Sequence, residues 1–433
     1  MRVVLLTQYW EPDTSIPQRR WSWLADILSE NGHELVVVAP PSIKEREKDW
    51  KAVLRTRENL LKGKWVKGVH GERILRTGFL PSGRSLTLRA VNQGTIALSS
   101  VIAIGHKRSE LLDLEPALVI GTVPAVPTTI AAFVAGRLLG IPYVIDLRDA
   151  WPDLLNDWAS WNTGVGKKSW RERLLGRGTV QLLFKALEAV MNYILRSSSG
   201  IMTTSSWLTD RLFSDVIADK RKPSVVVRNV FPTQSYIGDR AQGSVFARDR
   251  ELRVLYAGTI GRAQKLENVI DSLKIAQLRG IKVKLRMVGD GASRRSLQEY
   301  SQKSGTDVEF LGKLPVDKLE EHYLWSDTAL VHLTNWESLR MAIPSKTFEL
   351  MENRVHITAV VGGEAAQIVR DSRSGHVVPP NDPEALCDHW ARLIENPSLL
   401  SVSDCGSRWV KRERDIKTPE KLVEFLNSVS NKG

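Results

Sequence analysis

Short runs of aliphatic and β-branched residues alternate with amphipathic stretches along nearly the whole chain. In the first half the runs are VVLLTQYW, HELVVVAP, ERILRTGF, ALVIG, YVIDL, GIMTTS and SVVVRNVF, and in the second half they are ELRVLYAGT, KVKLRMVGDG, DVEFLG, TALVHLT, HITAVVGG and SGHVVPP. Strands that alternate with helices predict parallel sheets with crossover helices on both faces. We therefore expect an α/β protein built from doubly wound domains.

The alternation breaks once, between residues 232 and 250, where the segment PTQSYIGDRAQGSVFARDR has no periodicity and carries two glycines and several charges. Such a segment is typical of a linker. A chain of 433 residues is also too long for one ordinary core. We predict a first domain over residues 1–231, a linker over 232–250, a second domain over 251–415 and a C-terminal helix over 416–433.

Composition places the chain among folded globular proteins, with 42% hydrophobic and 25% charged residues. Its two cysteines, Cys387 and Cys405, are too few for a disulfide framework, so a reducing cytosol is the expected compartment. The start MRVVLLTQYW has too short an apolar run for a secretory leader and fits a first strand. The uncharged stretch from Pro116 to Gly136 has the length of a membrane span, but Pro124 and Pro127 interrupt it, which predicts strand, loop and helix instead.

The net charge of +12 is concentrated in two segments of the first half. Residues 44–89 hold thirteen Lys or Arg against five Asp or Glu, giving +8, and residues 167–177 hold five against one, giving +4. A localised basic surface favours an acidic partner, either anionic lipid headgroups or nucleic acid, although an ordinary solvated face explains the charge equally well. Nucleic acid is the weakest of these interpretations because neither segment contains a known nucleic-acid-binding motif.

The stretch MAIPSKTFELMEN, residues 341–353, follows a predicted strand and opens a helix. With Ser345 as N-cap, the first amides of the helix and the charge of Lys346 would form an anion site. Glu349, one turn further on, would repel phosphate but can accept hydrogen bonds from two vicinal sugar hydroxyls. Together these residues describe a nucleotide-linked ligand. An ordinary capped helix is the alternative.

Three more strand ends in the second half lead through glycine turns into helices. In YAGTIGRAQKLENVI, Gly258 and Gly261 permit a close backbone approach, and Arg262 and Lys265 could neutralise a diphosphate. The other turns are MVGDGASRRSL, with Gly289 and Asp290, and VVGGEAAQIV, with Gly363 and Glu364. Each turn alone is common in α/β proteins, but four at one sheet edge indicate a binding site.

The order and the residue sequences of these turns resemble those of retaining glycosyltransferases of family 4, which have the GT-B fold of two Rossmann-like domains facing across a cleft. The resemblance covers nearly the whole chain through LYAGTIGRAQKLENVIDSLK, MVGDG, VEFLGKLP, PSKTFELM, VVGGEAAQIV and GHVVPPNDPEAL. TQYWEPDTSIPQRRWSWLADILSENGHELVVVAP and GIPYVIDLRDAWPD are similar to the bacterial subgroup that builds surface polysaccharides, including N-acetylfucosamine transferases. RDAWPD and PSK are the more specific pieces.

The resemblance implies an acceptor-binding first domain, a nucleotide-sugar-binding second domain and a C-terminal helix that crosses back to the first. Glu349 matches the second glutamate of the family's E-x7-E signature, which holds the donor ribose. The Gly261–Lys265 loop and the Ser345–Lys346 helix start match the diphosphate-binding edge, and the backbone at Lys313 and Leu314 would meet the base. On the acceptor side the candidates are Ser15, in the TSIPQ loop that replaces the family's glycine-rich loop, and Asp149 of RDAWPD, which could equally cap the next helix.

Several positions depart from the family pattern. Met341 stands at the first glutamate of the signature, and Thr259 and Gln264 replace the common Arg and Lys. The remaining departures are Arg354 and His356 for a glycine and a proline, and Gln367 for a frequent Glu. These departures do not fix which sugar the donor carries or whether the protein turns the donor over. A UDP-sugar epimerase and a non-catalytic GT-B binding protein therefore remain alternatives.

The implied reaction transfers a sugar from a nucleotide-sugar, UDP-linked in our expectation, to a glycan carried on polyprenyl diphosphate. Helix-end amides with Arg262 and Lys265, and then Lys346, would stabilise the departing diphosphate. The resemblance implies front-face attack, so we name no general base. No metal or other cofactor is expected, because the eight histidines lack ligand spacing and GT-B enzymes work without a bound divalent ion. The amphipathic stretch from Trp170 to Leu195 suits contact with an anionic membrane from the cytoplasm, or a core-facing helix.

Overall fold

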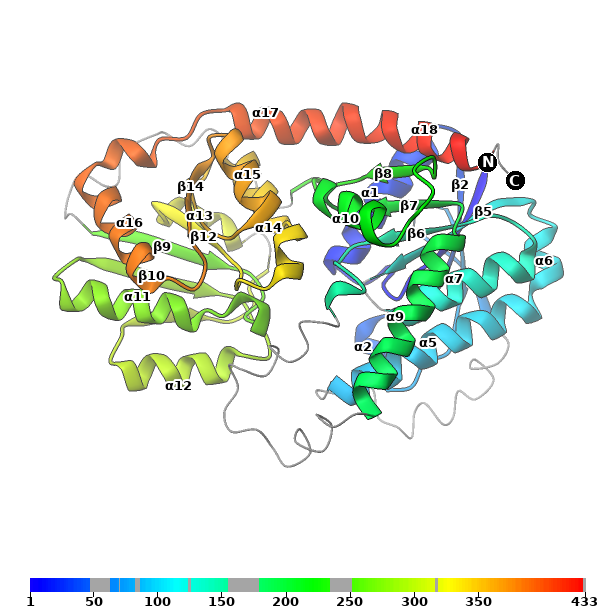
Figure 1. The fold of residues 1–433 in the computed structure, drawn as a ribbon, viewed down its shortest axis with the longest axis horizontal. Coiled ribbons are helices and arrows are strands. Elements are labelled where there is room, and N and C mark those ends of the chain that lie inside the picture. Colours follow the sequence, from blue (N-terminus) through cyan, green and yellow to red (C-terminus); the bar gives the residue numbers. More distant parts are fainter. Residues whose placement is uncertain are drawn as a thin grey trace. The chain divides into compact units, whose positions relative to one another are not determined.

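The computed structural model describes residues 1–46, 63–69, 71–81, 86–123, 126–154, 179–233, 251–315 and 318–430. The chain divides into two compact units, each built on its own sheet (Figure 1). Of the described residues, 1–154, 179–231 and 418–430 form the first unit, and 232–233 with 251–417 form the second unit.

The sheet of the first unit has the strand order β3-β4-β2-β1-β5-β6-β7-β8, and all neighbours run parallel except β3 and β4. The strands are β1 (Arg2–Leu6), β2 (Glu34–Ala39), β3 (Lys64–Lys67), β4 (Arg73–Arg76), β5 (Pro116–Val123), β6 (Tyr143–Leu147), β7 (Gly200–Thr203) and β8 (Ser224–Val226). β1, β5 and β6 are almost wholly buried aliphatic runs, as expected for central parallel strands covered on both faces.

The helices of the first unit are α1 (Ile16–Glu30), α2 (Ile43–Arg46), α5 (Leu86–His106), α6 (Arg108–Leu112), α7 (Val126–Leu139), α9 (Thr179–Ser197), α10 (Ser206–Asp215) and α18 (Thr418–Ser430). α5, α7 and α9 pack side by side (Figure 1). α18 lies against β8 and buries Phe425 and Val429 beside Gly200, where any side chain would collide with them. The last helix of the chain is therefore part of the first unit.

The sheet of the second unit is entirely parallel, with the order β11-β10-β9-β12-β13-β14. Its strands are β9 (Leu252–Ala257), β10 (Val283–Val288), β11 (Val308–Leu311), β12 (Thr328–His332), β13 (Ile357–Val360) and β14 (Gly375–Val378). The strand order reverses direction between β9 and β12. In open α/β sheets the carboxyl ends of strands at such a switch point form the ligand-binding edge.

The helices of the second unit are α11 (Glu267–Leu278), α12 (Arg294–Ser304), α13 (Leu319–Trp325), α14 (Ser345–Glu352), α15 (Gly363–Asp371), α16 (Pro383–Glu395) and α17 (Cys405–Arg412), with the 3-10 turns η2 (Arg262–Gln264), η4 (Glu337–Met341) and η5 (Pro397–Leu400) and the π-helical turn η6 (Glu413–Lys417). α11, α12 and α16 cover one face of the sheet and α13, α14 and α15 the other (Figure 1). Trp390 of α16 and Leu273 of α11 are buried in the core between helices and sheet.

The prediction of two doubly wound α/β domains is confirmed. Every strand predicted from the sequence is present, and among the described residues the prediction missed one strand, β3, an edge strand that is antiparallel to β4 and mostly exposed. The uncharged stretch at Pro116 is strand β5 followed by helix α7, as predicted. No helix among the described residues is long and apolar enough to cross a membrane.

Some predictions fall on parts of the chain outside the described residues. These are nearly all of the predicted linker, the whole basic segment 167–177, part of the basic segment 44–89 and residues 170–178 of the amphipathic stretch that starts at Trp170.

Candidate functional site

Glu349 and Lys346 lie on one face of α14 and form a hydrogen-bonded cluster with Tyr323 of α13. Tyr323 is fully buried, and its hydroxyl donates to Glu349 Oε1 at 2.7 Å. Lys346 Nζ is 2.9 Å from Glu349 Oε2 and 3.0 Å from the Tyr323 hydroxyl. The side chain of Glu349 is only 13% exposed. Its carboxylate is therefore oriented by two fixed donors instead of moving freely in solvent.

The start of α14 corrects one prediction from the sequence. Pro344, not Ser345, occupies the N-cap position, and its carbonyl accepts a hydrogen bond from the backbone N–H of Thr347. Ser345 is the first helical residue and makes no capping bond through its side chain. The reason is that Pro344 has the extended conformation that precedes a helix, and the helix begins directly after it.

Lys346 also differs from the simplest expectation of an open cation beside a diphosphate. Its ammonium pairs with Glu349 one turn later and lies 5.7 Å from the centre of the Tyr323 ring. An i, i+3 pair on a helix surface brings the two charges together. Lys346 can thus hold the carboxylate in place as well as face an anion.

The loop after β9 carries Gly258 and Gly261 and ends in η2. The hydroxyl of the buried Tyr256 donates to the carbonyl of Thr259 at 2.6 Å, which anchors this loop to the end of β9. Lys265 follows η2 in the left-handed conformation, with φ of 40°, and is exposed. Its ammonium makes no hydrogen bond or ion pair with the part of the chain that the structure describes.

The loop after β10 lies directly against the loop after β9. Gly289 has φ of +145°, and a Cβ at this position would lie 1.9 Å from the carbonyl oxygen of Gly258. A Cβ on Gly291 would lie 2.2 Å from the carbonyl oxygen of Ile260. Asp290 Oδ1 accepts a hydrogen bond from the Gly291 amide at 2.8 Å, so its carboxylate closes its own turn. Only glycine permits two loop backbones to approach this closely.

The loops after β12 and β13 are interlocked in the same way. Gly363, at the start of α15, has φ of +63°, and a Cβ there would lie 1.8 Å from the carbonyl oxygen of Arg340 in η4. Glu364 is 3% exposed, so the surface at this point is formed by backbone and not by its carboxylate. Met341, at the position of the family's first glutamate, is buried at 8% exposure.

Lys313 and Leu314 lie in the loop after β11, and Lys313 is exposed. The Gly289 amide donates to the carbonyl of Leu311 at 3.3 Å, which joins this loop to the glycine turn. All the donor-side candidates from the sequence are thus placed on loops and helix starts that follow the carboxyl ends of β9 to β13. Their individual roles stay predictions.

Histidines that are scattered in the sequence meet inside the second unit. His356 Nε2 lies 2.9 Å from His376 Nδ1, and the ring centroids of His376 and His389 are 5.4 Å apart. His332, at the end of β12, is buried beside Asn268, and burial lowers its pKa to about 4. Nevertheless, no group of three or more His, Cys, Asp or Glu among the described residues could hold a metal ion.

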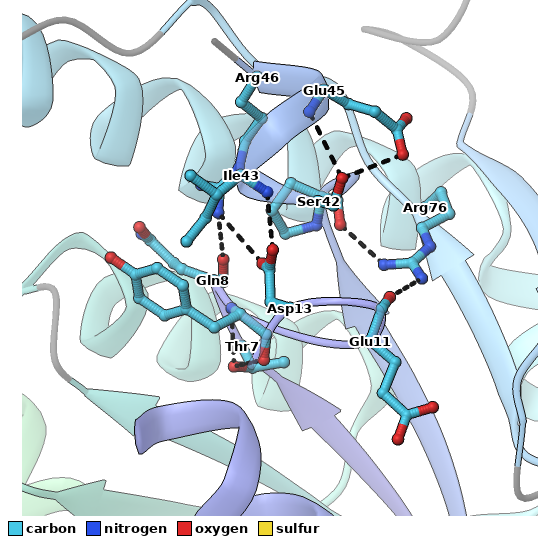
Figure 2. Close-up of polar contacts among 11 residues, drawn as sticks. Thr7, Gln8, Glu11, Asp13, Ser42, Ile43, Glu45, Arg46 and Arg76 are labelled. Atoms are coloured by element: carbon cyan, nitrogen blue, oxygen red, sulfur yellow. Dashed lines mark hydrogen bonds and ion pairs between the residues drawn. The ribbon is translucent and has the colours of Figure 1, made fainter. Parts of the chain in front are cut away.

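The carboxyl edge of the first unit carries a buried polar cluster that fixes the loop after β1 (Figure 2). Asp13 Oδ1 accepts from the Ile43 amide at 2.9 Å, and burial raises the pKa of Asp13. Arg46 donates to the carbonyl of Gln8 at 3.1 Å, and Arg76 donates to the carbonyls of Glu11 and Pro40. These bonds tie the β1 loop to the segment after β2 and to the end of β4.

The two acceptor-side candidates lie at this edge of the first unit. Ser15 is the N-cap of α1, and its buried hydroxyl has no hydrogen-bond partner. Asp149 follows β6 and is exposed. Its backbone carbonyl accepts from the amide of Trp151 at 2.7 Å.

Two residues near the candidate sites were not found from the sequence. Tyr323, in the segment EEHYLW, fits an ordinary buried position of a short helix, and only the fold brings it to Glu349. Arg148 stands inside the quoted motif RDAWPD next to Asp149, but nothing in the sequence shows whether its charge is paired.

With this geometry described, comparisons with known proteins define the class. Residues 226–408 match the family model "Glycosyl transferases group 1". The crystal structure of Anabaena HepE in complex with UDP and glucose has a TM-score of 0.61 and 14% identity to the chain, covering 99% of this chain and 100% of that one. Architecture and neighbours together define the GT-B fold.

Two curated relatives agree with this class. The probable glycosyltransferase WbjE of Pseudomonas aeruginosa is 29% identical over 154 residues, which are 35% of this chain and only 37% of WbjE. The putative colanic acid biosynthesis glycosyl transferase WcaI of Escherichia coli K12 is 23% identical over 424 residues, covering 94% of both chains. The chain is a glycosyltransferase with the GT-B fold, and its match to the group 1 model covers residues 226–408.

Proposed function

We propose that the chain is a retaining glycosyltransferase that moves a sugar from a UDP-linked donor to a growing surface glycan carried on a lipid diphosphate. The observation that carries the donor half is the Glu349 carboxylate, held by Tyr323 and Lys346 at the carboxyl edge of the second sheet. A fixed carboxylate suits the two vicinal hydroxyls of a ribose. HepE, a neighbour in fold, was solved with UDP and glucose, which supports a uridine nucleotide.

The diphosphate would lie where the interlocked glycine loops expose their backbone, near Arg262 and Lys265. Loop amides and the first turn of α14 offer fixed donors for the charge that develops on the leaving oxygen. Lys265 is the better of the two cations, because it is exposed and without a partner in the described residues. No general base is assigned, which agrees with front-face attack assisted by the donor phosphate.

The acceptor proposal depends on the relatives and on charge. WcaI is named for colanic acid biosynthesis, which favours a polysaccharide product, and the sequence resembles N-acetylfucosamine transferases, which favours an N-acetylhexosamine donor. The excess positive charge of the first half, +12 in all, suits an acceptor presented at an anionic membrane surface. Peripheral association with that surface belongs to this proposal.

A non-catalytic GT-B binding protein is the second candidate, and Met341 favours it. The family's first glutamate is replaced by a buried apolar side chain, so one carboxylate of the site is missing. Such a protein would bind the nucleotide without turning the donor over.

The test is a transfer assay with a panel of UDP- and GDP-sugars and lipid-linked acceptor extracts, run with wild type and Glu349→Ala. We expect one UDP-sugar to give a new glycolipid whose glycosidic bond keeps the donor's anomeric configuration, and at least a hundredfold less product from the variant, corresponding to about 2.7 kcal/mol. Nucleotide binding without product from any donor would favour the binding protein. A new sugar epimer formed from donor alone would identify an epimerase.

A further inference from the structure

The guanidinium of Arg148, directly after β6, is a cation without a hydrogen-bond or ion-pair partner among the described residues. Its Nε and Nη1 atoms are buried and have no hydrogen-bond partner. No ion pair joins Arg148 to any residue of the part of the chain that the structure describes. The residue as a whole is partly exposed.

The buried carboxylate of Asp146, two residues before Arg148, is already engaged. Arg20 Nη2 donates to Asp146 Oδ1 at 3.0 Å, and Trp21 Nε1 donates to Asp146 Oδ2 at 2.8 Å. Asp149, the neighbour of Arg148 in the chain, forms no hydrogen bond or ion pair with it in the described structure. Among the described residues, Asp146 and Asp149 act on Arg148 through longer-range charge and not as ion-pair partners.

Leaving such a group unpaired is costly. A buried cation without a hydrogen-bonded partner loses its hydration, which typically costs several kcal/mol, and the charges of Asp146 and Asp149 offset only part of this cost for Arg148. Desolvation first, and then the charge of Arg20, lower the pKa of Arg148 to about 10 against the opposite effect of Asp146 and Asp149. Arg148 is still charged at neutral pH. An arginine kept in this state is a candidate for a functional site, because a bound anion would remove the penalty.

The neighbouring strand ends add polar groups that also lack partners. They are the Thr122 hydroxyl near the end of β5, the Gln8 side-chain oxygen after β1, and the Trp151 indole N–H after β6. Thr122 pairs in register with Asp146, two residues before Arg148, so these groups share one edge of the sheet. The hydroxyl and the indole can donate hydrogen bonds to an anion.

We propose that Arg148 is the anchor of an oxyanion-binding site at the carboxyl edge of the first sheet, with the Thr122 hydroxyl and the Trp151 N–H as additional donors. The planar fork of arginine matches the two oxygens of a phosphate or a carboxylate. Assigning this anion to the acceptor, as the phosphate of a lipid carrier or the carboxylate of an acidic sugar, rests on the proposed function. The site itself does not.

The test measures anion binding with the nucleotide site occupied. Wild type, Arg148→Met, Arg148→Lys and the exposed control Arg221→Met are saturated with UDP, and melting temperatures are recorded with and without pyrophosphate or glucuronate. We expect one anion to raise the melting temperature of wild type and of the Arg221 control, but not that of Arg148→Met. Arg148→Lys keeps the charge without the fork, so calorimetry should show about tenfold weaker binding of that anion.

Without any anion, Arg148→Met should melt at the same temperature as wild type or about 2–4 °C higher, because it removes an unpaired buried charge. A melting temperature several degrees lower would instead mark Arg148 as structural and overturn the proposal. An anion response that persists in Arg148→Met, or no response of wild type to either anion, would overturn it as well.

Pyrophosphate and glucuronate distinguish the two sources of the anion. UDP titrations of the same variants separate this proposal from the proposed function: Arg148→Met should bind UDP within about twofold of wild type, since its charge is not placed in the nucleotide site. If folded wild type fails to bind UDP, the proposed function fails, while the anion response of Arg148 remains measurable without UDP.

Discussion

At the scale of residues, the candidate site depends on how one carboxylate is held. Glu349 is flanked by a neutral donor, the Tyr323 hydroxyl, and a charged one, the Lys346 ammonium, and these two are also in contact with each other. Hydrogen bonds to a charged group are stronger than neutral ones and fix its direction. The buried Tyr323 hydroxyl therefore positions the Glu349 carboxylate for contact with a ligand. The hydroxyl itself does not contact that ligand.

Replacing Tyr323 with phenylalanine tests this positioning role. Tyr323→Phe should weaken UDP binding about three- to tenfold, because Glu349 loses one of its two orienting bonds, whereas kcat should change less than twofold. Calorimetry and steady-state kinetics separate the two effects. Tyr300→Phe, which removes a surface bond to Asp271, is the matched control and should change neither quantity. Equal losses in kcat and affinity would argue against a purely positioning role.

At the scale of elements, the donor edge is formed by loops that lock into one another. The glycine turn after β10 lies on the loop after β9, and the turn before α15 lies on η4. These close backbone approaches bring strand ends that are distant in the sequence into one surface. The arrangement places amides, and not long side chains, at the edge where a diphosphate would bind.

Gly289→Ala is the sharpest test of this interlocking. A methyl group at this position would collide with the carbonyl of Gly258, and φ of +145° is strained for alanine, so we expect a loss of about 2–4 kcal/mol in the stability of the second unit and weaker UDP binding. Gly280→Ala has φ of +71° but no atom within 4 Å, and should cost about 1 kcal/mol without affecting UDP. Urea unfolding and calorimetry measure both. Similar losses for the two variants would show that the close approach is not structural.

At the scale of the whole molecule, each unit has its own core, and the two respond to different perturbations. The second unit holds the buried histidines, and burial lowers the pKa of His332 and of His389 to about 4. The first unit is completed by α18 from the far end of the chain. The two units should therefore differ in how their stability depends on pH.

The sign of the pH effect follows from these depressed pKa values. Unfolded histidine titrates near 6.5, so between about pH 6.5 and 4 the unfolded chain binds protons that the folded second unit excludes. Stability is full above about pH 6.5 and falls as the pH drops, by about 3 kcal/mol for His332 alone at pH 4. Urea unfolding at pH 7.5, 5.5 and 4.5 should show this loss, reduced in His332→Asn. His106→Gln, at an exposed histidine of α5, is the control and should leave the slope unchanged.

Much of the fold was predictable because the local signals agree. Central strands such as β5 and β13 are mostly apolar runs, and glycine turns mark the ends of several strands of the second unit, such as β13. β3 was missed because a four-residue exposed edge strand, KWVK, has no buried face to produce alternation. The Ser345 cap was wrong because the helix begins directly after Pro344, a distinction of one residue that sequence patterns do not resolve.

The candidate site was predictable only in part, for a physical reason. Residues next to glycine turns, such as Gly258 and Gly289, can be placed at a sheet edge because parallel strands end together there. The partners of a charge come from elsewhere in the chain, so the sequence did not show that Lys346 pairs with Glu349 or that the buried Nε and Nη1 atoms of Arg148 lack a hydrogen-bond partner. Those facts depend on side-chain directions set by the finished fold.

The most direct test of the central claim asks whether Glu349 recognises ribose hydroxyls. UDP and its 2′,3′-dideoxy analogue are titrated into wild type and Glu349→Gln. We predict that wild type binds UDP about 10- to 100-fold more tightly than the dideoxy analogue, because hydrogen bonds to a charged group contribute about 1.5–3 kcal/mol. Glu349→Gln should bind the two ligands with nearly equal affinity. A preference that is equally large in Glu349→Gln, or absent from folded wild type, would contradict the account.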